Sequence, residues 1–341
     1  MAGLCAAARA RELGLAPAVV EKGDRPGGSM LLSSGVVWRY RSLDTFRREC
    51  PDGDPRLQQV IVEQLDDALD WLESLGAPVT EKTTTNPLTV GRRFDPRGLT
   101  EALVRAAGRV ELSRAFVPGN ETARVVLATG GFAVRLAGKH GLALRANPWS
   151  SGDGLDFGVG RGAATSAGME EFYGRAMPAP PARWGEAEFV DHAQLYGRFA
   201  KVFDEDGKQI PVDPEDWSEN GLVQQIARRS GLAWYVVDGR DLGRETPYGT
   251  IADLIERARS AGAKVEEQAG DAAVHVAAAV THTIGGLAID ERARVLGVDG
   301  RPIDGLYAAG VDAGGWSTGG YASGLAAALV FGRIAAEEIA S

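Results

Sequence analysis

The chain has 341 residues, a net charge of −9 and 45 glycines, which are about 13% of the residues against a usual share near 7%. No Gly-X-Y period or low-complexity tract accompanies them, which excludes collagen and disorder, and the acidic balance argues against nucleic-acid binding. The two cysteines, Cys5 and Cys50, suggest neither a disulfide scaffold nor a zinc site. With no signal peptide and no apolar stretch of membrane-spanning length, we expect a cytoplasmic protein of about two domains.

The first predicted elements are an Ala-rich helix over 1–13, a turn at Gly14 and a short strand over 18–22 that ends in Glu21 and Lys22. This order matches the second half of a dinucleotide-binding unit, in which an acid after the second strand binds ribose hydroxyls. Gly3 then corresponds to the third glycine of the Gly-x-Gly-x-x-Gly turn, while the first strand and two glycines are missing. The alternative is that Gly3 is only a small residue in an ordinary amphipathic helix.

Two glycine and serine turns follow the acid, at 27–29 and 33–35. Backbone N–H groups and hydroxyls in such turns donate to anionic oxygens. The turns therefore favour a phosphate or a ring lying close to the backbone.

Five segments together resemble the fumarate reductase/succinate dehydrogenase flavoprotein family, which includes ketosteroid dehydrogenases. Each motif is weak alone, but they occur in the family's order over nearly the whole chain. They are 20–29 (the acid and the first Gly-Gly-Ser turn), Val125–Phe132, Ser151–Gly154, Thr283–Leu287 and Gly305–Gly310.

The resemblance implies an α/β fold: a Rossmann-like FAD-binding domain that lacks its first strand, with an inserted α+β cap domain. The expected boundaries are 1–170 for the first part of the FAD-binding domain, 171–280 for the cap and 281–341 for the C-terminal part. Periodicity predicts helices over 57–76 and 97–108, and a closing helix over about 324–340. Residues 110–122 leave room for one or two short strands. Within the cap we expect a strand over 200–203, a helix over 224–229 and a strand over 234–238.

The resemblance also implies noncovalent FAD, because residues 28–35 contain no His, Cys or Tyr to form a covalent link. Glu21 would bind the adenosine ribose, Asp312 would lie near the ribityl chain, and the helix that starts at Gly324 would face the flavin N1/C2-carbonyl edge. The full set of predicted cofactor residues is Gly3, Glu21, Lys22, Gly27, Gly28, Ser29, Ser34, Gly35, Ala128, Thr129, Gly130, Gly131, Asp153, Gly310, Asp312, Gly324, Leu325 and Ala326.

The expected active site departs from the fumarate reductase pattern at two arginines. Ser218 stands where the family has its arginine proton donor, and Gly320 or Tyr321 stands where it has an arginine that clamps carboxylates. Neither replacement can hold a carboxylate bidentately, so we predict that the chain does not act on fumarate or succinate.

Three residues are the candidates for catalysis. Tyr321 and Tyr173 are candidate acid/base groups, because ketosteroid dehydrogenases of this family use tyrosines. His282 matches a substrate-binding histidine, and with a pKa near neutrality it could orient a carbonyl or shuttle a proton. A tyrosine in a glycine-rich turn is as often a packing residue, and the remaining histidines have no spacing that suggests a metal site.

We therefore predict an FAD-dependent oxidoreductase that moves a hydride between flavin N5 and a carbon next to a carbonyl of a weakly charged, steroid-like substrate. Its partners would be that small molecule and an unidentified electron acceptor or donor, with no nucleic acid, metal or membrane span. Two alternatives stay open: a truncated family member that binds FAD poorly or not at all, and an amine- or hydroxyl-oxidising flavoenzyme that shares only the FAD domain.

Overall fold

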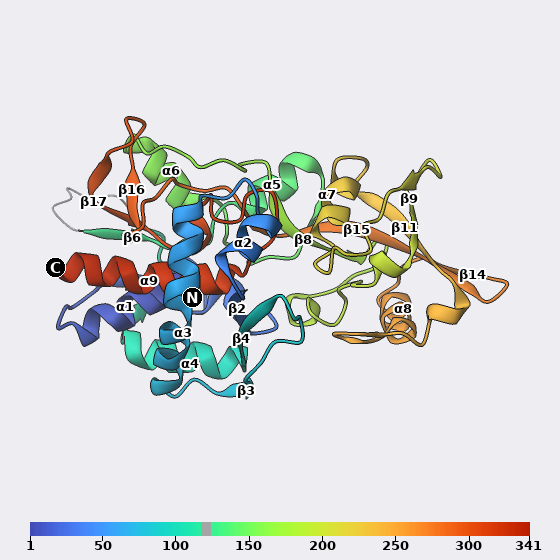
Figure 1. Ribbon diagram of the computed structural model, residues 1–341, viewed down its shortest axis with the longest axis horizontal. Coiled ribbons are helices and arrows are strands. Elements are labelled where there is room, and N and C mark those ends of the chain that lie inside the picture. Colours follow the sequence, from blue (N-terminus) through green and yellow to red (C-terminus); the bar gives the residue numbers. More distant parts are fainter. Residues whose placement is uncertain (117–123) are drawn as a thin grey trace. The chain divides into compact units, whose positions relative to one another are not determined.

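The computed structural model describes residues 1–116 and 124–341, which form two compact units (Figure 1). Unit 1 comprises 1–132, 147–171 and 282–341, and unit 2 comprises 133–146 and 172–281. The sequence assigned residues 133–146 to the first part of the FAD-binding domain, whereas in the structure they pack within unit 2. Part of the segment 110–122, where short strands were expected, lies outside the described residues.

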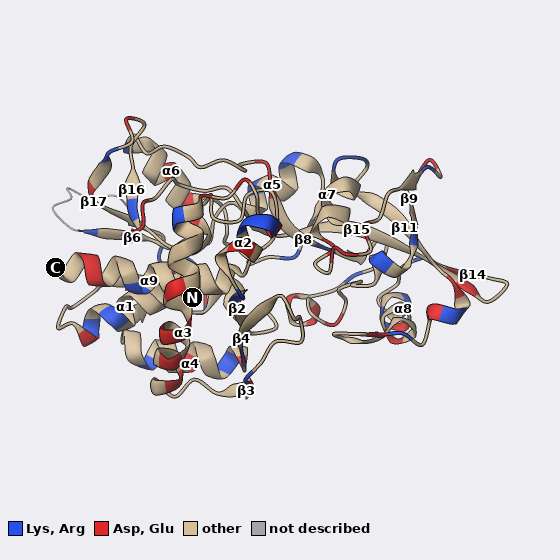
Figure 2. Cartoon of the chain, in the orientation of Figure 1, with Lys and Arg blue, Asp and Glu red and all other residues tan. Residues whose placement is uncertain are grey.

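Unit 1 contains six of the described α-helices, and α9 is the longest one with a mainly apolar sequence. Their bounds are α1 Ala2–Glu12, α2 Leu43–Glu49, α3 Pro55–Ser74, α4 Pro96–Ala107, α6 Asp153–Gly160 and α9 Gly324–Ala340. Figure 2 shows that α9 carries charged residues only in its C-terminal half. The N-terminal half of α9 therefore contains no charged side chain that would oppose its burial in unit 1.

Helix starts in unit 1 follow side-chain capping. Asp54 precedes Pro55 at the start of α3 and accepts from the Arg56 N–H at 2.9 Å, and Asp95 precedes Pro96 and accepts from the Gly98 N–H at 2.6 Å. Proline at the first helical position and an acid before it are both favoured. Helix α1 packs along α9, where a Cβ on Gly332 would lie 2.7 Å from the Ala2 carbonyl oxygen. Only glycine allows that approach.

The strands of unit 1 form three separate sheets. Strands β1 (Val19–Val20) and β5 (Val110–Glu111) are parallel, with Val19 opposite Val110. Strand β6 (Val125–Leu127) is parallel to β17 (Pro302–Ala308), which also pairs antiparallel with β16 (Arg294–Leu296). The third sheet has the antiparallel order β2 (Val36–Tyr40), β4 (Thr89–Phe94), β3 (Val79–Glu81).

The two parallel pairs have one property in common. Helix α1 contacts both β1 and β6, yet among the described residues these two strands do not pair with each other, and each has one partner strand. The side chains of Val19, Val20, Val125 and Val126 are only partly buried. Among the described residues, each of these two strands therefore has one edge without a partner strand.

Unit 2 is built on the long strand β15. Its other elements are α5 Ala133–His140, α7 Asn220–Ala227, α8 Ile251–Ser260, β7 Ala143–Leu144, β8 Phe172–Pro178, β9 Lys201–Phe203, β10 Gln209–Ile210, β11 Leu232–Val237, β12 Glu245–Thr246, β13 Gly249–Thr250, β14 Val265–Gln268 and β15 Asp271–Thr283. The sheet order is β10-β9-β11-β15-β14, and β7 and β8 also pair with β15.

The secondary structure expected in these segments is present with small shifts. The predicted strands at 200–203 and 234–238 are β9 and β11, while the helix expected over 224–229 is α7 and begins earlier, at Asn220. None of the described helices is long and apolar enough to cross a bilayer.

Candidate functional site

The turn after β6 is held by a buried carboxylate. Asp312 is 1% exposed, and its oxygens accept from the N–H of Thr129, from the Thr129 hydroxyl at 3.0 Å and from the Gly131 N–H at 3.0 Å. Burial raises the pKa of Asp312, and these donors act in the opposite direction. Asp312 therefore fixes the backbone of the predicted Ala128–Gly131 turn.

Two buried hydroxyls next to this turn have no hydrogen-bond partner in the part of the chain that the structure describes. A Cβ on Gly130 would lie 3.0 Å from Ser150 Oγ, and one on Gly131 would lie 2.5 Å from Thr283 Oγ1. Both hydroxyls are fully buried without a hydrogen bond. Buried polar groups are normally satisfied, so hydroxyls of this kind suit a polar ligand laid against the glycines.

The start of α9 presents backbone amide donors. Ser323 caps the helix and accepts from the Ala326 N–H at 3.3 Å, so the predicted ligand Ala326 already donates within the protein. The first amide groups, of Gly324 and Leu325, precede the intrahelical bonds. Gly324 and Leu325 are partly exposed. The positive end of a long helix thus has two N–H groups available to an anionic or carbonyl oxygen.

Tyr321 is anchored on both sides of its own backbone. The Tyr40 hydroxyl donates to the Tyr321 carbonyl at 2.6 Å, and the Tyr321 N–H donates to the Cys50 thiol. The Tyr321 ring meets Trp38 edge-on, with centroids 5.5 Å apart. The preceding Gly320 has no room for a side chain, because a Cβ there would lie 1.9 Å from the Glu49 carbonyl oxygen. This predicted catalytic residue is therefore held in one place by its surroundings.

His282 lies against the α9 start. A Cβ on Gly324 would lie 3.2 Å from His282 Nε2, while Nδ1 is 3.1 Å from the Thr283 carbonyl oxygen. Removal from water lowers the pKa of His282 to about 4. The expectation of a pKa near neutrality is corrected by this burial: His282 is neutral at pH 7, and its Nδ1–H donates to Thr283.

The Glu21 turn lies at another part of unit 1. Glu21 Oε1 accepts from the Gly23 N–H at 2.7 Å, and Lys22 Nζ lies 2.9 Å from Asp153 Oδ2. The predicted cofactor residues Lys22 and Asp153 are thus brought together as an ion pair with each other.

The remaining predicted glycines have different neighbours. Gly27 and Gly35 have positive φ values of 108° and 71°, and a Cβ on Gly35 would lie 2.0 Å from the Phe94 carbonyl oxygen. Packing within unit 1 alone therefore requires glycine at position 35. Gly28 and Ser29 lie in the 3₁₀ turn Gly28–Met30, and Ser34 lies in the next loop. Gly3 and Gly310 lie where α1 packs on its neighbours: Gly3 of α1 faces Ala128, and Gly310 faces Ala2 of α1.

Tyr173 belongs to unit 2, on β8, where the Arg175 guanidinium lies over its ring at 4.7 Å. Ser218 is also in unit 2 and is buried, with its hydroxyl 2.6 Å from Asp216 Oδ1. These contacts give Ser218 a structural role in the turn before α7.

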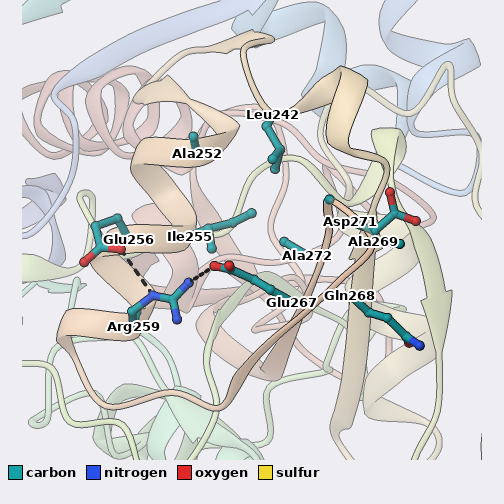
Figure 3. Close-up of a pocket in the computed structure, with 11 residues that line it drawn as sticks. Leu242, Ala252, Ile255, Glu256, Arg259, Glu267, Gln268, Ala269, Asp271 and Ala272 are labelled. Atoms are coloured by element: carbon teal, nitrogen blue, oxygen red, sulfur yellow. Dashed lines mark hydrogen bonds and ion pairs between the residues drawn. The ribbon is translucent and has the colours of Figure 1, made fainter.

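Unit 2 has a hollow of about 350 Å³ between α8 and the β14–β15 hairpin, and Figure 3 shows the residues that line it. Leu242 and Ile255 line its apolar part, and Arg259 forms ion pairs with Glu256 and Glu267. None of the predicted site residues lies there.

Sequence reasoning missed Trp149, Ser150 and Thr283 as members of the site. Ser150 precedes the recognised segment Ser151–Gly154 by one residue, and Thr283 is the first residue of Thr283–Leu287 but was not named as a site residue; the signal of each is only a hydroxyl near a glycine turn. No pattern in the sequence pointed to Trp149, because its contact is with Gly23, far away along the chain.

Glycine turns beside parallel strands, a helix start and buried hydroxyls without a hydrogen-bond partner among the described residues together suit an anionic cofactor laid against the backbone. The family described as "FAD binding domain" matches residues 1–123 and 113–327, and the chain belongs to it. It is a family of FAD-dependent oxidoreductases that act on CH–CH groups, and the predicted cofactor is thereby confirmed as FAD. Noncovalent attachment stays a prediction.

Similar proteins agree with this family. The chain is 24% identical over 440 aligned positions to a probable fumarate reductase, Ifc3, of Shewanella frigidimarina, covering 99% of the chain and 73% of the relative. A flavocytochrome c3 fumarate reductase in an open conformation has a TM-score of 0.71 at 21% identity, covering 99% of this chain and 76% of that one. The 3-ketosteroid-Δ4-(5α)-dehydrogenase of Rhodococcus jostii RHA1 has a TM-score of 0.71 at 18% identity, covering 100% and 95%. The predicted resemblance is confirmed, and at these identities the solved structures show the shared fold alone.

Proposed function

We propose that the chain moves a hydride between flavin N5 and a carbon adjacent to a carbonyl of a weakly charged, steroid-like small molecule. A Rossmann-like FAD-binding domain with an inserted cap domain is part of this proposal, as is a separate electron acceptor or donor. The R. jostii relative, whose structure holds 4-androstene-3,17-dione, supports the substrate class as an analogy.

The observation that carries the proposal is that the loop 312–323 around Tyr321 contains no cationic side chain, and the charged groups that approach it at Gly319 are the carboxylates of Glu171 and Asp52. The only ionisable acid or base in the loop 312–323 besides Tyr321 is Asp312, and that carboxylate is buried against the Thr129 and Gly131 N–H groups. Trp38 and Tyr40 pack against Tyr321 from β2. A dicarboxylate needs cationic donors at this position, whereas an aromatic wall suits an apolar ring system.

The residues of the chain would divide the work as follows. When bound, FAD supplies the two-electron chemistry. The Gly324 and Leu325 N–H groups would stabilise negative charge beside the α9 start. The Tyr321 hydroxyl would donate or accept the proton at the carbonyl end of the substrate, in a position fixed by Tyr40 and Cys50. Neutral His282 would present its Nε2 as a hydrogen-bond acceptor, since its Nδ1–H donates to Thr283.

The experiment is dye-linked turnover of the FAD-loaded chain on a panel of 3-ketosteroids, with succinate and fumarate as the charged comparison. We expect turnover of an uncharged ketone and at most trace activity on the dicarboxylates. Robust succinate or fumarate turnover would contradict the proposal.

A second test targets Tyr321 itself. The variant Tyr321→Phe keeps the ring against Trp38 but loses the hydroxyl, so we expect kcat to fall about 100-fold or more, the usual range for a lost general acid or base. The flavin absorption spectrum should not change. The matched control is Tyr307→Phe on β17, which removes the hydroxyl of another tyrosine of unit 1 and should leave kcat within about twofold.

A second candidate function is a family member that binds FAD weakly. The observation that favours it is the separation of the β1–β5 pair from the β6–β17 pair. The visible spectrum of the purified chain decides: flavin bands support the first proposal, while a folded, colourless chain that takes up no added FAD supports the second.

A further inference from the structure

The main chain around Glu21 is fixed by the segment that follows β5. The Glu21 N–H donates to the Glu111 carbonyl at 2.8 Å, and the Arg114 N–H donates to the Glu21 carbonyl at 2.9 Å. The carboxylate itself is drawn back over the turn by the Gly23 N–H. Glu21 therefore has one oxygen committed to the protein and a backbone that is held on one side.

The other side of the turn is held by the loop 149–153. Lys22 Nζ lies 2.6 Å from Ser151 Oγ and 2.9 Å from Asp153 Oδ2, and the Ser151 hydroxyl donates to Asp153 Oδ1 at 2.7 Å. Both charged groups of this small network are engaged with each other. A direct contact of either charge with a phosphate would have to compete with this pair.

Trp149 adds an apolar contact to the same junction. A Cβ on Gly23 would lie 2.9 Å from the Trp149 ring, so the indole rests directly on the glycine that binds the Glu21 carboxylate. The Arg25 guanidinium lies over the Trp149 ring, 5.4 Å from its centroid. Three successive links therefore join residues 21–25 to residues 149–153.

We propose that Lys22, Asp153 and Trp149 form a clamp that positions Glu21 toward the adenosine ribose of FAD, and that the two charges act through each other rather than as cofactor ligands. Lys22, Asp153 and Trp149 are called the Glu21 clamp below. The inference rests on FAD binding by this family and is independent of the substrate proposed above. Substrate turnover plays no part in its test, so failure of one leaves the other intact.

The expected effects are modest because the side chains of Lys22 and Asp153 are 38% and 39% exposed. Solvent screening at such exposure leaves an ion pair little free energy. Loss of the pair should weaken FAD binding by about two- to fivefold. FMN lacks the adenosine half, so its affinity should not change.

The experiment is a double-mutant cycle on the full chain, with dissociation constants for FAD and FMN measured by calorimetry on apoprotein. The variants are Lys22→Met, Asp153→Asn and the double variant, together with Lys22→Arg, which preserves the pair. Asp156→Asn is the matched control, because it removes the other acidic residue in the first turn of α6. Thermal unfolding of each apoprotein checks that the variants fold.

The double-mutant cycle distinguishes charges that act through each other from charges that each bind FAD. If the charges act through each other, the double variant weakens FAD binding no more than either single variant, and Lys22→Arg binds as the wild type does. The inference would be overturned if the fold-losses of FAD affinity in the two single variants multiplied in the double variant. It would also be overturned if both single variants kept the FAD affinity of the wild type, or if FMN affinity fell as much as FAD affinity.

Discussion

Two regions of unit 1 hold their charges in opposite ways. Near the α9 start, the Asp312 carboxylate is buried and bound to backbone donors, and Tyr321 is fixed through its own main chain. At the Glu21 clamp, Lys22 and Asp153 are half-exposed and bound to each other. The geometry near the α9 start therefore depends on buried contacts with the backbone, and changing them costs much folding free energy. The geometry of the Glu21 clamp depends on a solvated network, which tolerates substitution.

The largest effect is expected at Asp312. Asp312→Asn removes the negative charge and turns one acceptor into a donor that faces the Thr129 and Gly131 N–H groups. We expect the free energy of unfolding to fall by about 3 kcal/mol, because a buried group loses charge-assisted hydrogen bonds. Urea unfolding of the apoprotein measures this.

The exposed Asp304→Asn on β17 is the control for Asp312 and should change stability by less than about 0.5 kcal/mol. If both substitutions cost the same, the contrast between a buried and a solvated charge in unit 1 would be wrong.

The next effect concerns the backbone before Tyr321. Gly320→Ala would place a Cβ 1.9 Å from the Glu49 carbonyl oxygen and 2.9 Å from the Cys50 sulfur. The loop must shift, at a cost of about 2 kcal/mol, and turnover should fall with it while FAD stays bound. Gly160→Ala at the end of α6, where a Cβ has open space, is the matched substitution and should be neutral or slightly stabilising. Equal stability of the two variants would show that the Tyr321 loop is not tightly held.

A smaller effect is expected from pH. Burial lowers the pKa of His282 from 6.5 to about 4, so between these values the unfolded chain binds the proton that the folded chain refuses. The stability contributed by neutral His282 is thus present above about pH 6.5 and is lost as the pH falls toward 4.

The measurement is the free energy of unfolding of the wild type and of His282→Asn across that range. We expect the wild type to lose about 1–2 kcal/mol more than the variant, a figure reduced because the ring is only partly buried. If the two curves of unfolding free energy against pH were parallel, His282 would be as solvated as the Glu21 clamp. The double-mutant cycle on that clamp is expected to give the smallest effect of all.

Much of the fold followed from local pattern. The closing helix was predicted over about 324–340 and is α9, because glycine and serine before an apolar run mark a helix start. The family motifs located the turn 128–131 and the Glu21 turn. Short-range signals of this kind need no knowledge of what packs against them.

The contacts that give the site its character could not be predicted, because they join residues that are distant in sequence. The contacts of the Asp312 carboxylate with Thr129 and Gly131 were not predicted, and its expected place near the ribityl chain stays a prediction. Lys22 and Asp153 are 131 residues apart, and each was expected to contact FAD on its own. The pKa of His282 depends on burial, which the sequence does not encode locally.

The edges of β1 and β6 that lack a partner strand among the described residues have a consequence for concentrated solutions of the protein. Within the described residues, each has one edge without a partner strand beside partly exposed valines, and such an edge is a template on which extended segments of other molecules can add. Both are very short, of 2 and 3 residues, which limits the length of any intermolecular ladder. At high concentration we expect any pairing between molecules to begin at these two strands, which border the cofactor motifs.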